Sequence, residues 1–104
     1  MNITIIGSTA YREKMIAYKQ QLEKEGHAVR MPAFDDHEGM DEIGVCKYNL
    51  EAIRWADRID VIWDARSTGF IFDFGMCFAL DKPIKIVYLN TKTFQNLLIK
   101  YAEE

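Results

Sequence analysis

The sequence lacks any apolar run of about 20 residues, the length that spans a bilayer, so a membrane-spanning protein is not expected. Its N-terminus lacks the charged region and the cleavage site of a signal peptide, which predicts a cytoplasmic protein. An excess of basic residues is also missing: the net charge is −3, with acids and bases interspersed. We therefore expect neither nucleic acid nor a membrane as a partner.

Cysteine is scarce. The only two, Cys46 and Cys77, fall in segments expected to be helical, and a reducing compartment makes a disulfide between them unexpected. Cys77 stands between Met76 and Phe78 and is interpreted as a small core residue. Cys46 is given a structural role too.

Repeats, linkers and low-complexity segments are absent, and 104 residues suffice for one compact domain but not for two. Residues 1–104 are therefore expected to form a single domain. What this domain contains is a regular alternation of strand-like and helix-like segments. The predicted strands cover residues 2–6, 27–31, 59–63 and 84–89.

Caps and apolar stripes indicate the helices between these strands. Ser8 or Thr9 is expected to cap the first helix, Asp41 the second, and Ser67 or Thr68 the third. Apolar residues then recur every three or four positions. The stripes are Tyr11, Met15, Tyr18 and Leu22 in the first helix, Ile43, Cys46, Leu50 and Ile53 in the second, and Phe94, Leu97, Leu98 and Tyr101 in a final helix that begins at Thr91 or Thr93.

The third helix has two apolar faces, and a helix in a small monomer needs only one. One face is expected to pack on the sheet, and its members are Phe72, Gly75, Met76 and Ala79. The other carries Phe70, Phe74 and Phe78. Two interpretations of this second face stay open: a neighbouring helix covers it, or it forms a homodimer interface.

Alternating strands and helices predict a three-layer α/β domain with a flavodoxin-like (Rossmann-like) fold and a mostly parallel sheet of order 2-1-3-4. Ligands of such sheets bind beyond the carboxyl ends of the strands, where the strand order reverses. That point lies between the first and third strands. Gly7 and Ser8 follow the first strand, and residues 64–69 follow the third, so these two turns are expected to meet in one crevice.

The chemistry of this crevice suits an anion. Ser67 and Gly69 stand at a helix start, where free N–H groups and the helix dipole favour negative charge. Arg12 and Arg66 are near enough in sequence to add positive charge. The alternatives stay open that the serines only cap helices and that Arg12 is a solvated first-turn residue.

Asp73 lies one helical turn after Gly69 and is flanked by Phe72 and Phe74. A carboxylate among aromatic side chains has a raised pKa unless it is hydrogen-bonded. From the residues alone, Asp73 is either a structural cap or ion-pair partner, or a nucleophile or acid–base group at a sugar carbon.

The segment 32–40 is an expected loop that contains Asp35, Asp36, His37 and Glu38. Three interpretations stay open: a solvated acidic loop, a lid over a ligand, and a metal site, although the spacing is unlike that of a calcium loop.

Several of these features resemble the nucleoside 2-deoxyribosyltransferase family, which includes the 2′-deoxynucleoside 5′-phosphate N-hydrolases. They are Gly7-Ser8 after the first strand, the Ala56-Asp57 turn, and the segment 67–75 (Ser-Thr-Gly-Phe-Ile-Phe-Asp-Phe-Gly) leading to Lys82-Pro83. The order of elements matches over nearly the whole chain, and the specific part is about twenty residues around Asp73.

The resemblance implies a role for each matching position. Asp73 takes the place of the family's nucleophilic Glu, and Ser67 that of the Ser that holds a 5′-phosphate. Gly7 and Ser8 correspond to the phosphate turn. Arg12 is the nearest substitute for a displaced arginine. No metal and no cofactor is implied.

Two positions depart from the family pattern. Asp73 is one methylene shorter than Glu, and misplacement by about 1 Å costs about 100-fold in rate. Asn49 stands where the family has a second acid; it can hold a sugar hydroxyl but cannot act as a general acid. Asp64 or Asp57 is a candidate to compensate, so Asp64 joins Asp73 as a candidate catalytic residue.

The predicted function is hydrolysis or transfer at the N-glycosidic bond of a nucleoside or nucleoside 5′-monophosphate, with residues of the segment 32–40 covering the base. A non-catalytic nucleotide-binding module on the same fold is the first alternative. An interaction module that binds a partner through Phe70, Phe74 and Phe78 is the second.

Overall fold

The computed structural model describes residues 1–33 and 39–103 and contains one four-stranded sheet. The strands are β1 (Asn2–Ile6), β2 (Ala28–Arg30), β3 (Arg58–Asp64) and β4 (Ile84–Asn90). Their order is β2-β1-β3-β4 and all pairs are parallel, which confirms the predicted α/β class and strand order. β2 is shorter than the predicted strand at residues 27–31.

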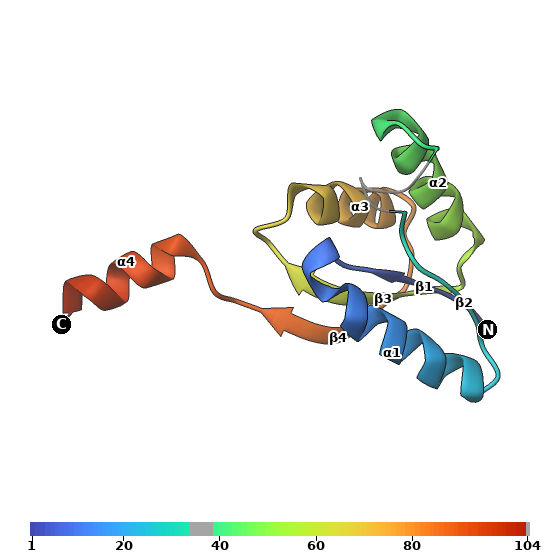
Figure 1. The fold of residues 1–104 in the computed structure, drawn as a ribbon, viewed down its shortest axis with the longest axis horizontal. Helices are drawn as coiled ribbons and strands as arrows, with labels where there is room; N and C mark the ends of the chain where they lie inside the picture. The colour runs from blue at the N-terminus through green and yellow to red at the C-terminus, as the bar shows by residue number, and fades with distance from the viewer. Residues whose placement is uncertain (34–38, 104) are drawn as a thin grey trace.

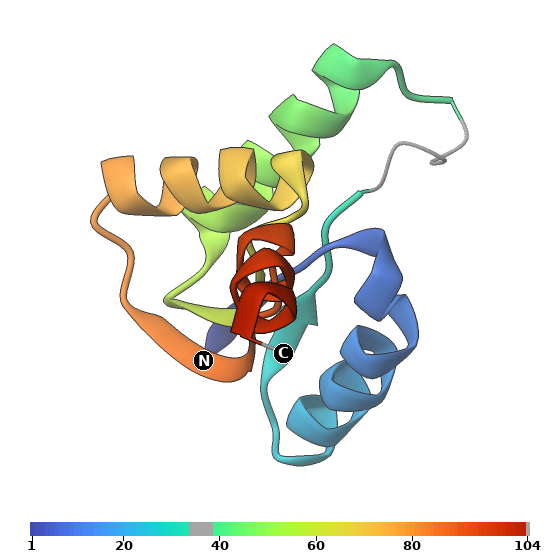
Figure 2. The ribbon, with the colours of Figure 1, turned by 90° about the vertical axis from the view of Figure 1, so that its left-hand side faces the viewer.

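Helices cover both faces of this sheet (Figures 1 and 2). α1 (Arg12–Lys24) lies on one face, and α2 (Glu42–Trp55) and α3 (Thr68–Ala79) lie on the other. α4 (Phe94–Glu103) follows β4 and extends away from the sheet (Figure 1). Among the described residues, no helix is long and apolar enough to cross a bilayer.

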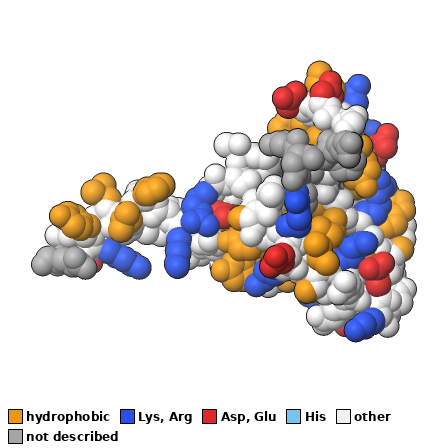
Figure 3. Space-filling model, in the orientation of Figure 1, with side chains coloured by type: hydrophobic (Ala, Val, Ile, Leu, Met, Phe, Trp, Pro, Cys, Tyr) orange, Lys and Arg blue, Asp and Glu red, His pale blue; other side chains and the backbone are white. Residues whose placement is uncertain are grey.

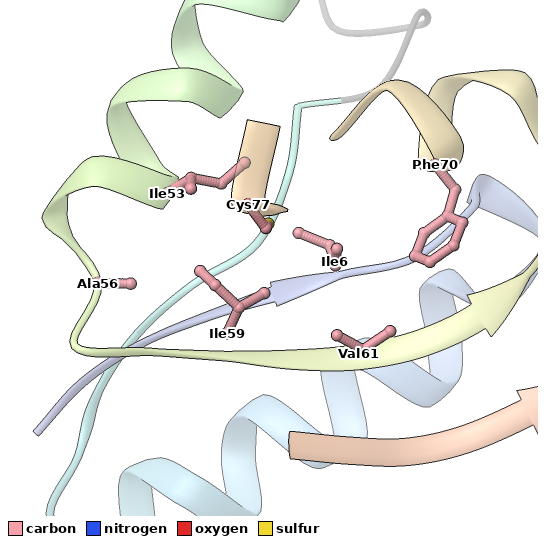
Figure 4. Close-up of a cluster of buried hydrophobic side chains, with 7 residues drawn as sticks. All are labelled: Ile6, Ile53, Ala56, Ile59, Val61, Phe70 and Cys77. Carbon is pink, nitrogen blue, oxygen red and sulfur yellow. The ribbon is translucent and has the colours of Figure 1, made fainter. Parts of the chain in front are cut away.

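The core is divided by the sheet into two clusters. The larger cluster lies between the sheet and the helices α2 and α3, and it is drawn in Figure 4. The smaller one lies between the sheet and α1 and is built on Ile5, Met15 and Ile62. The strands β1 and β3 contribute to both clusters because successive side chains of a strand point to opposite faces.

The face of α3 that packs on the sheet differs from the predicted one. Its buried residues are Phe70, Asp73 and Cys77, whereas Phe72 is 55% exposed and Gly75 and Ala79 are exposed as well. Met76 of the predicted face does pack, partly buried, against the larger cluster. The prediction was wrong for the other three because α3 is apolar on nearly every side, so the apolar pattern does not identify the buried face. Phe70 is therefore a core residue and not part of an outward-facing surface.

The first helix begins differently from the prediction. A short 3-10 turn, η1 (Thr9–Tyr11), precedes α1, and the Ser8 side chain makes no capping bond. The prediction that Ser8 or Thr9 caps α1 was therefore wrong. Asp41 does cap α2, since its Oδ1 accepts from the Gly44 N–H at 2.8 Å.

β4 contains an irregularity in its pairing with β3. Val61 pairs with Ile86 and the next residue, Ile62, pairs with Tyr88, so Val87 is an extra residue on β4. Ile84 and Ile86 consequently lie on the α3 side of the sheet with Ile59 and Val61, while Tyr88 lies on the α1 side with Ile62.

Candidate active site

A cavity of about 370 Å³ opens at the carboxyl ends of β1 and β3, a size within the usual range for small-molecule sites. It lies at the switch point where the sequence predicted a crevice. Its lining includes seven of the nine candidate residues: Gly7, Ser8, Asn49, Arg66, Ser67, Gly69 and Asp73. The other two, Arg12 and Asp64, are not part of the lining.

Asp73 is the buried ionisable group of this cavity. It is only 7% exposed, and its Oδ2 accepts one hydrogen bond, from Asn49 Nδ2 at 3.4 Å. Burial raises the pKa of Asp73 from 3.8 to about 6, and the hydrogen bond from Asn49 opposes that rise. Asp73 is therefore mostly ionised at neutral pH but accepts a proton readily.

The backbone of Ala33 holds Asn49 in one orientation. The Ala33 N–H donates to Asn49 Oδ1 at 2.8 Å, and Asn49 Nδ2 donates to the Ala33 carbonyl at 3.2 Å. An amide flipped the other way would oppose donor to donor, so Nδ2 must point toward Asp73. The chain segment that leads into residues 34–38 thus fixes the donor that Asp73 uses.

The Ser8 hydroxyl is buried and has no hydrogen-bond partner among the described residues. Ser8 lines the cavity directly after β1. Because buried polar groups in folded proteins almost always have a partner, an orphaned hydroxyl at a cavity wall indicates a place for a polar ligand atom.

The start of α3 forms the opposite wall. Ser67 caps this helix, with its Oγ accepting from the Phe70 N–H at 3.2 Å. The N–H groups of Thr68 and Gly69 have no intrahelical partner at this position and are available to an anion. A Cβ added at Gly69 would meet no atom within 4 Å, so there is open space beside this residue of the cavity wall.

Gly7 is needed for packing behind the cavity. A Cβ at this position would lie 3.2 Å from both Ile62 Cβ and Met15 Sδ. Such contacts are closer than nearly all real ones, so Gly7 allows β1 to end tightly against β3 and α1. The close packing of Gly7 against Ile62 and Met15 thus positions the turn that contains Ser8.

Asp64 and Arg66 form a bidentate ion pair. Arg66 Nε and Nη2 donate to the two oxygens of Asp64, each at 2.8 Å. These bonds hold the pKa of Asp64 below its usual value and raise that of Arg66. Asp64 is buried behind Arg66, which is half exposed and reaches the cavity. Asp64 thus positions a cation and is not itself part of the cavity lining.

The remaining predicted residues lie elsewhere. Asp57 Oδ2 accepts from the Asn2 N–H at 2.8 Å, which ties the start of β3 to β1. Asp35, Asp36, His37 and Glu38 lie outside the described residues. Within residues 1–33 and 39–103, no three His, Cys, Asp or Glu side chains gather closely enough to hold a metal ion.

Sequence reasoning missed Glu42, a second carboxylate in the cavity wall. The cavity-facing residues of α2 are Glu42, Val45, Cys46 and Asn49, spaced by three, one and three. That spacing is one face of a helix and was a usable signal once Asn49 was a candidate. Cys46, expected to be structural, is half-buried in this wall.

Comparisons with known proteins place the fold. The CMP N-glycosidase BcmB of Clostridium botulinum is similar over 100% of both chains, with a TM-score of 0.65 and 14% sequence identity. A conserved protein from Enterococcus faecalis V583 is similar over 100% of this chain and 75% of that chain, with a TM-score of 0.63 and 17% identity. No protein-family model matches the sequence, and the curated proteins give no significant match. The chain thus shares its fold, over its full length, with an N-glycosidase.

Proposed function

We propose that the chain cleaves the N-glycosidic bond of a nucleoside 5′-monophosphate, with Asp73 as the nucleophile. One observation carries the proposal: a buried carboxylate with a pKa of about 6 lines the same cavity as the start of α3, a position suited to an anion. The shared fold with a CMP N-glycosidase supports it, and makes CMP the first substrate to test.

The phosphate end of the substrate would lie between the two turns. Ser8 Oγ, which has no partner among the described residues, and the N–H groups of Thr68 and Gly69 offer donors from opposite walls. Arg66 adds positive charge at the same end, and Asp64 fixes its guanidinium. Donors of this kind recognise phosphate oxygens at helix starts.

The reaction would begin when an Asp73 oxygen attacks the anomeric carbon of the sugar. A carbon–oxygen bond forms to Asp73, the carbon–nitrogen bond to the base breaks, and its electron pair leaves with the base, which takes a proton from solvent. Water then attacks the same carbon, loses a proton, and releases the sugar phosphate and the Asp73 carboxylate. An acceptor base in place of water would give transfer.

Asn49 would serve this reaction through Asp73. Its Nδ2 stabilises the ionised form that attacks, and Ala33 keeps it from turning toward another partner. The base would lie along the apolar wall formed by Val45, Cys46 and Phe72. Glu42 is at the outer end of that wall, seven residues or about 10 Å along the helix from Asn49.

A non-catalytic nucleotide-binding module is the second candidate. It is favoured by Asn49, an amide that donates to Asp73 where a catalytic pair would have an acid. The other carboxylate in the described cavity wall, Glu42, is exposed and lies at the far end of the helix face.

The deciding experiment incubates the protein with CMP and with a panel of nucleosides and nucleoside 5′-monophosphates, and measures free base by chromatography. We expect base release that falls at least about 1,000-fold in Asp73→Asn. Asp81→Asn is the matched control, because Asp81 has a φ of 51°, a conformation that Asn adopts readily.

Full base release by Asp73→Asn would refute the mechanism. Saturable binding of CMP, seen as a rise in melting temperature with no base formed from any substrate, would favour the binding module instead.

A further inference from the structure

We propose that two copies of this chain form a dimer by exchanging α4, with the helix of each copy packed on β4 of the other. This assembly is independent of the proposed catalytic function. It rests on two apolar surfaces of one chain that lie apart and suit each other.

The first surface is α4 itself. This helix has no buried residue among those described. Four of its apolar side chains fall at spacings of three, one and three, which places them in a stripe on one side of the helix. This stripe consists of Phe94, Leu97, Leu98 and Tyr101, and Phe94 is 84% exposed. Ile99, 50% exposed, lies outside the stripe. Figure 3 shows hydrophobic side chains gathered on this projecting segment. A helix with such a stripe is stable in water only when the stripe is covered.

The second surface is the α3 side of β4. Ile84, Ile86 and Leu89 pair with Ile59, Val61 and Trp63 of β3, so they share the sheet face on which α3 lies. All three are exposed, and Ile86 is 58% exposed. Phe78 of α3 is 79% exposed. An open apolar strip on a sheet face is unusual in a soluble monomer.

The fold itself indicates that a helix belongs on this strip. α2 and α3 both cover this face, each reached by a right-handed connection. The helix after β4 would be next in that layer. α4, with 10 residues, is about 15 Å long, and the 7 residues of β4 span about 23 Å, so one helix can lie along the strand.

The chain's own α4 is directed away from that position. Only residues 91–93 separate β4 from α4, and hydrogen bonds hold this connection. Asn90 Nδ2 donates to the Tyr11 hydroxyl at 2.7 Å, and the Lys92 N–H donates to Asn90 Oδ1 at 2.9 Å. Asn96 Nδ2 donates to the Thr91 carbonyl at 2.9 Å.

To fold back onto its own β4, the chain would have to break this set of bonds. A short, rigid connection of this kind favours exchange between copies, in which each helix finds the same strip on a partner. The occupant of the strip is therefore α4 of a second copy. The contact is reciprocal and closes after two chains.

This assignment changes the predicted dimer surface. The sequence placed it on Phe70, Phe74 and Phe78 of α3. Phe70 is buried within its own chain, whereas Phe78 is exposed.

The test uses complementation between two defective copies. Leu97→Asp/Leu98→Asp spoils the helix stripe, and Ile86→Asp spoils the sheet strip. We expect the unmodified chain to run as a dimer in size-exclusion chromatography with light scattering, and each variant alone to run as a monomer. A mixture of the two variants restores one intact helix–sheet contact per pair, so a heterodimer should form.

Gln95→Asp, an exposed change outside the stripe, is the matched control and should remain dimeric. Far-UV circular dichroism shows whether each variant keeps its fold. A monomeric unmodified chain at all concentrations would overturn the proposal, as would variants that stay dimeric or monomeric variants that do not complement each other.

Discussion

Two regions on opposite sides of β3 each bury an aspartate, and they treat its charge differently. On the α1 side, Asp60 accepts from Arg58 Nε and Nη2 at 2.6 and 3.0 Å and from the Tyr18 hydroxyl at 2.6 Å. Between α2 and α3, Asp73 accepts one hydrogen bond from the described part of the chain, at 3.4 Å from a neutral amide.

The two aspartates differ in how their negative charge is compensated. Asp60 has a cation and a hydroxyl committed to its negative charge, and it raises the pKa of Arg58. Burial, together with the bond to Asp60, raises the pKa of Tyr18. Among the described residues, Asp73 has a neutral amide and no cation as its hydrogen-bond partner, and burial raises its pKa to about 6. Asp60 is thus held in an ion pair, whereas Asp73, the proposed nucleophile, has only a neutral hydrogen-bond donor among the described residues.

The largest expected effect comes from removing each carboxylate in turn. Asp60→Ala should lower the free energy of unfolding by about 3 kcal/mol or more, because Arg58 is left beside an empty, buried site. Asp73→Ala should lower it much less, because the loss of packing is offset by the loss of an unfavourable buried charge. Urea unfolding at pH 7 measures both values. Equal losses for the two variants would show that the regions do not differ in this way.

The second largest expected effect is on how the free energy of unfolding depends on pH, through the ionisation of Asp73. The pKa of Asp73 is raised in the folded state, so the folded protein is destabilised once Asp73 ionises. The penalty is absent below pH 4, grows between about pH 4 and 6, and is then constant at about 3 kcal/mol.

Asp73→Asn should therefore stabilise the fold at pH 8 and have little effect on stability at pH 4. Melting temperatures at the two pH values measure this change. Asp81→Asn, which alters an exposed aspartate, should show no such difference. A destabilised Asp73→Asn at pH 8 would contradict the assignment of an unfavourable charge to Asp73.

The smallest expected effect concerns the hydrogen bond that Asn49 Nδ2 donates to Asp73. In Asn49→Leu, Asp73 loses the donor that lowers its pKa, so the acid limb of the pH–rate profile should move upward by up to about one pH unit. Steady-state rates between pH 4.5 and 8 measure the shift. Glu42→Gln should leave the limb in place; a limb that moved with Glu42 and not with Asn49 would reassign the titrating group.

Much of the fold followed from the sequence because it depends on local patterns. Alternating strand and helix segments predicted the strand order, and the turns after β1 and β3 predicted where the cavity lies. The buried face of α3 was not predictable in this way. Its inward side contains Asp73, which interrupts the apolar pattern that would otherwise identify the face.

There are also physical reasons why some residues of the candidate site could not be identified from the sequence. Glu42 is an acid in the first turn of a helix, a position that favours acids through the helix dipole in any protein. Ala33 acts only through its backbone, and no sequence pattern marks such a role. The sequence predicted that the Ser8 side chain caps a helix, whereas the turn η1 leaves its hydroxyl without a partner in residues 1–33 and 39–103.

The extra residue in β4 has a consequence for the whole C-terminal arm. Because Val87 interrupts the pairing, side chains after it change sides, and Asn90 reaches the α1 side, where it meets Tyr11. If residues 84–90 paired one to one with β3, with no extra residue, Asn90 would fall on the α3 side, away from Tyr11. The bulge therefore helps to set the direction in which the chain leaves β4 for α4. Deleting Val87 would leave Tyr88 opposite Ile62 and Asn90 opposite Asp64, so the bond to Tyr11 and the path of the last helix should survive the deletion.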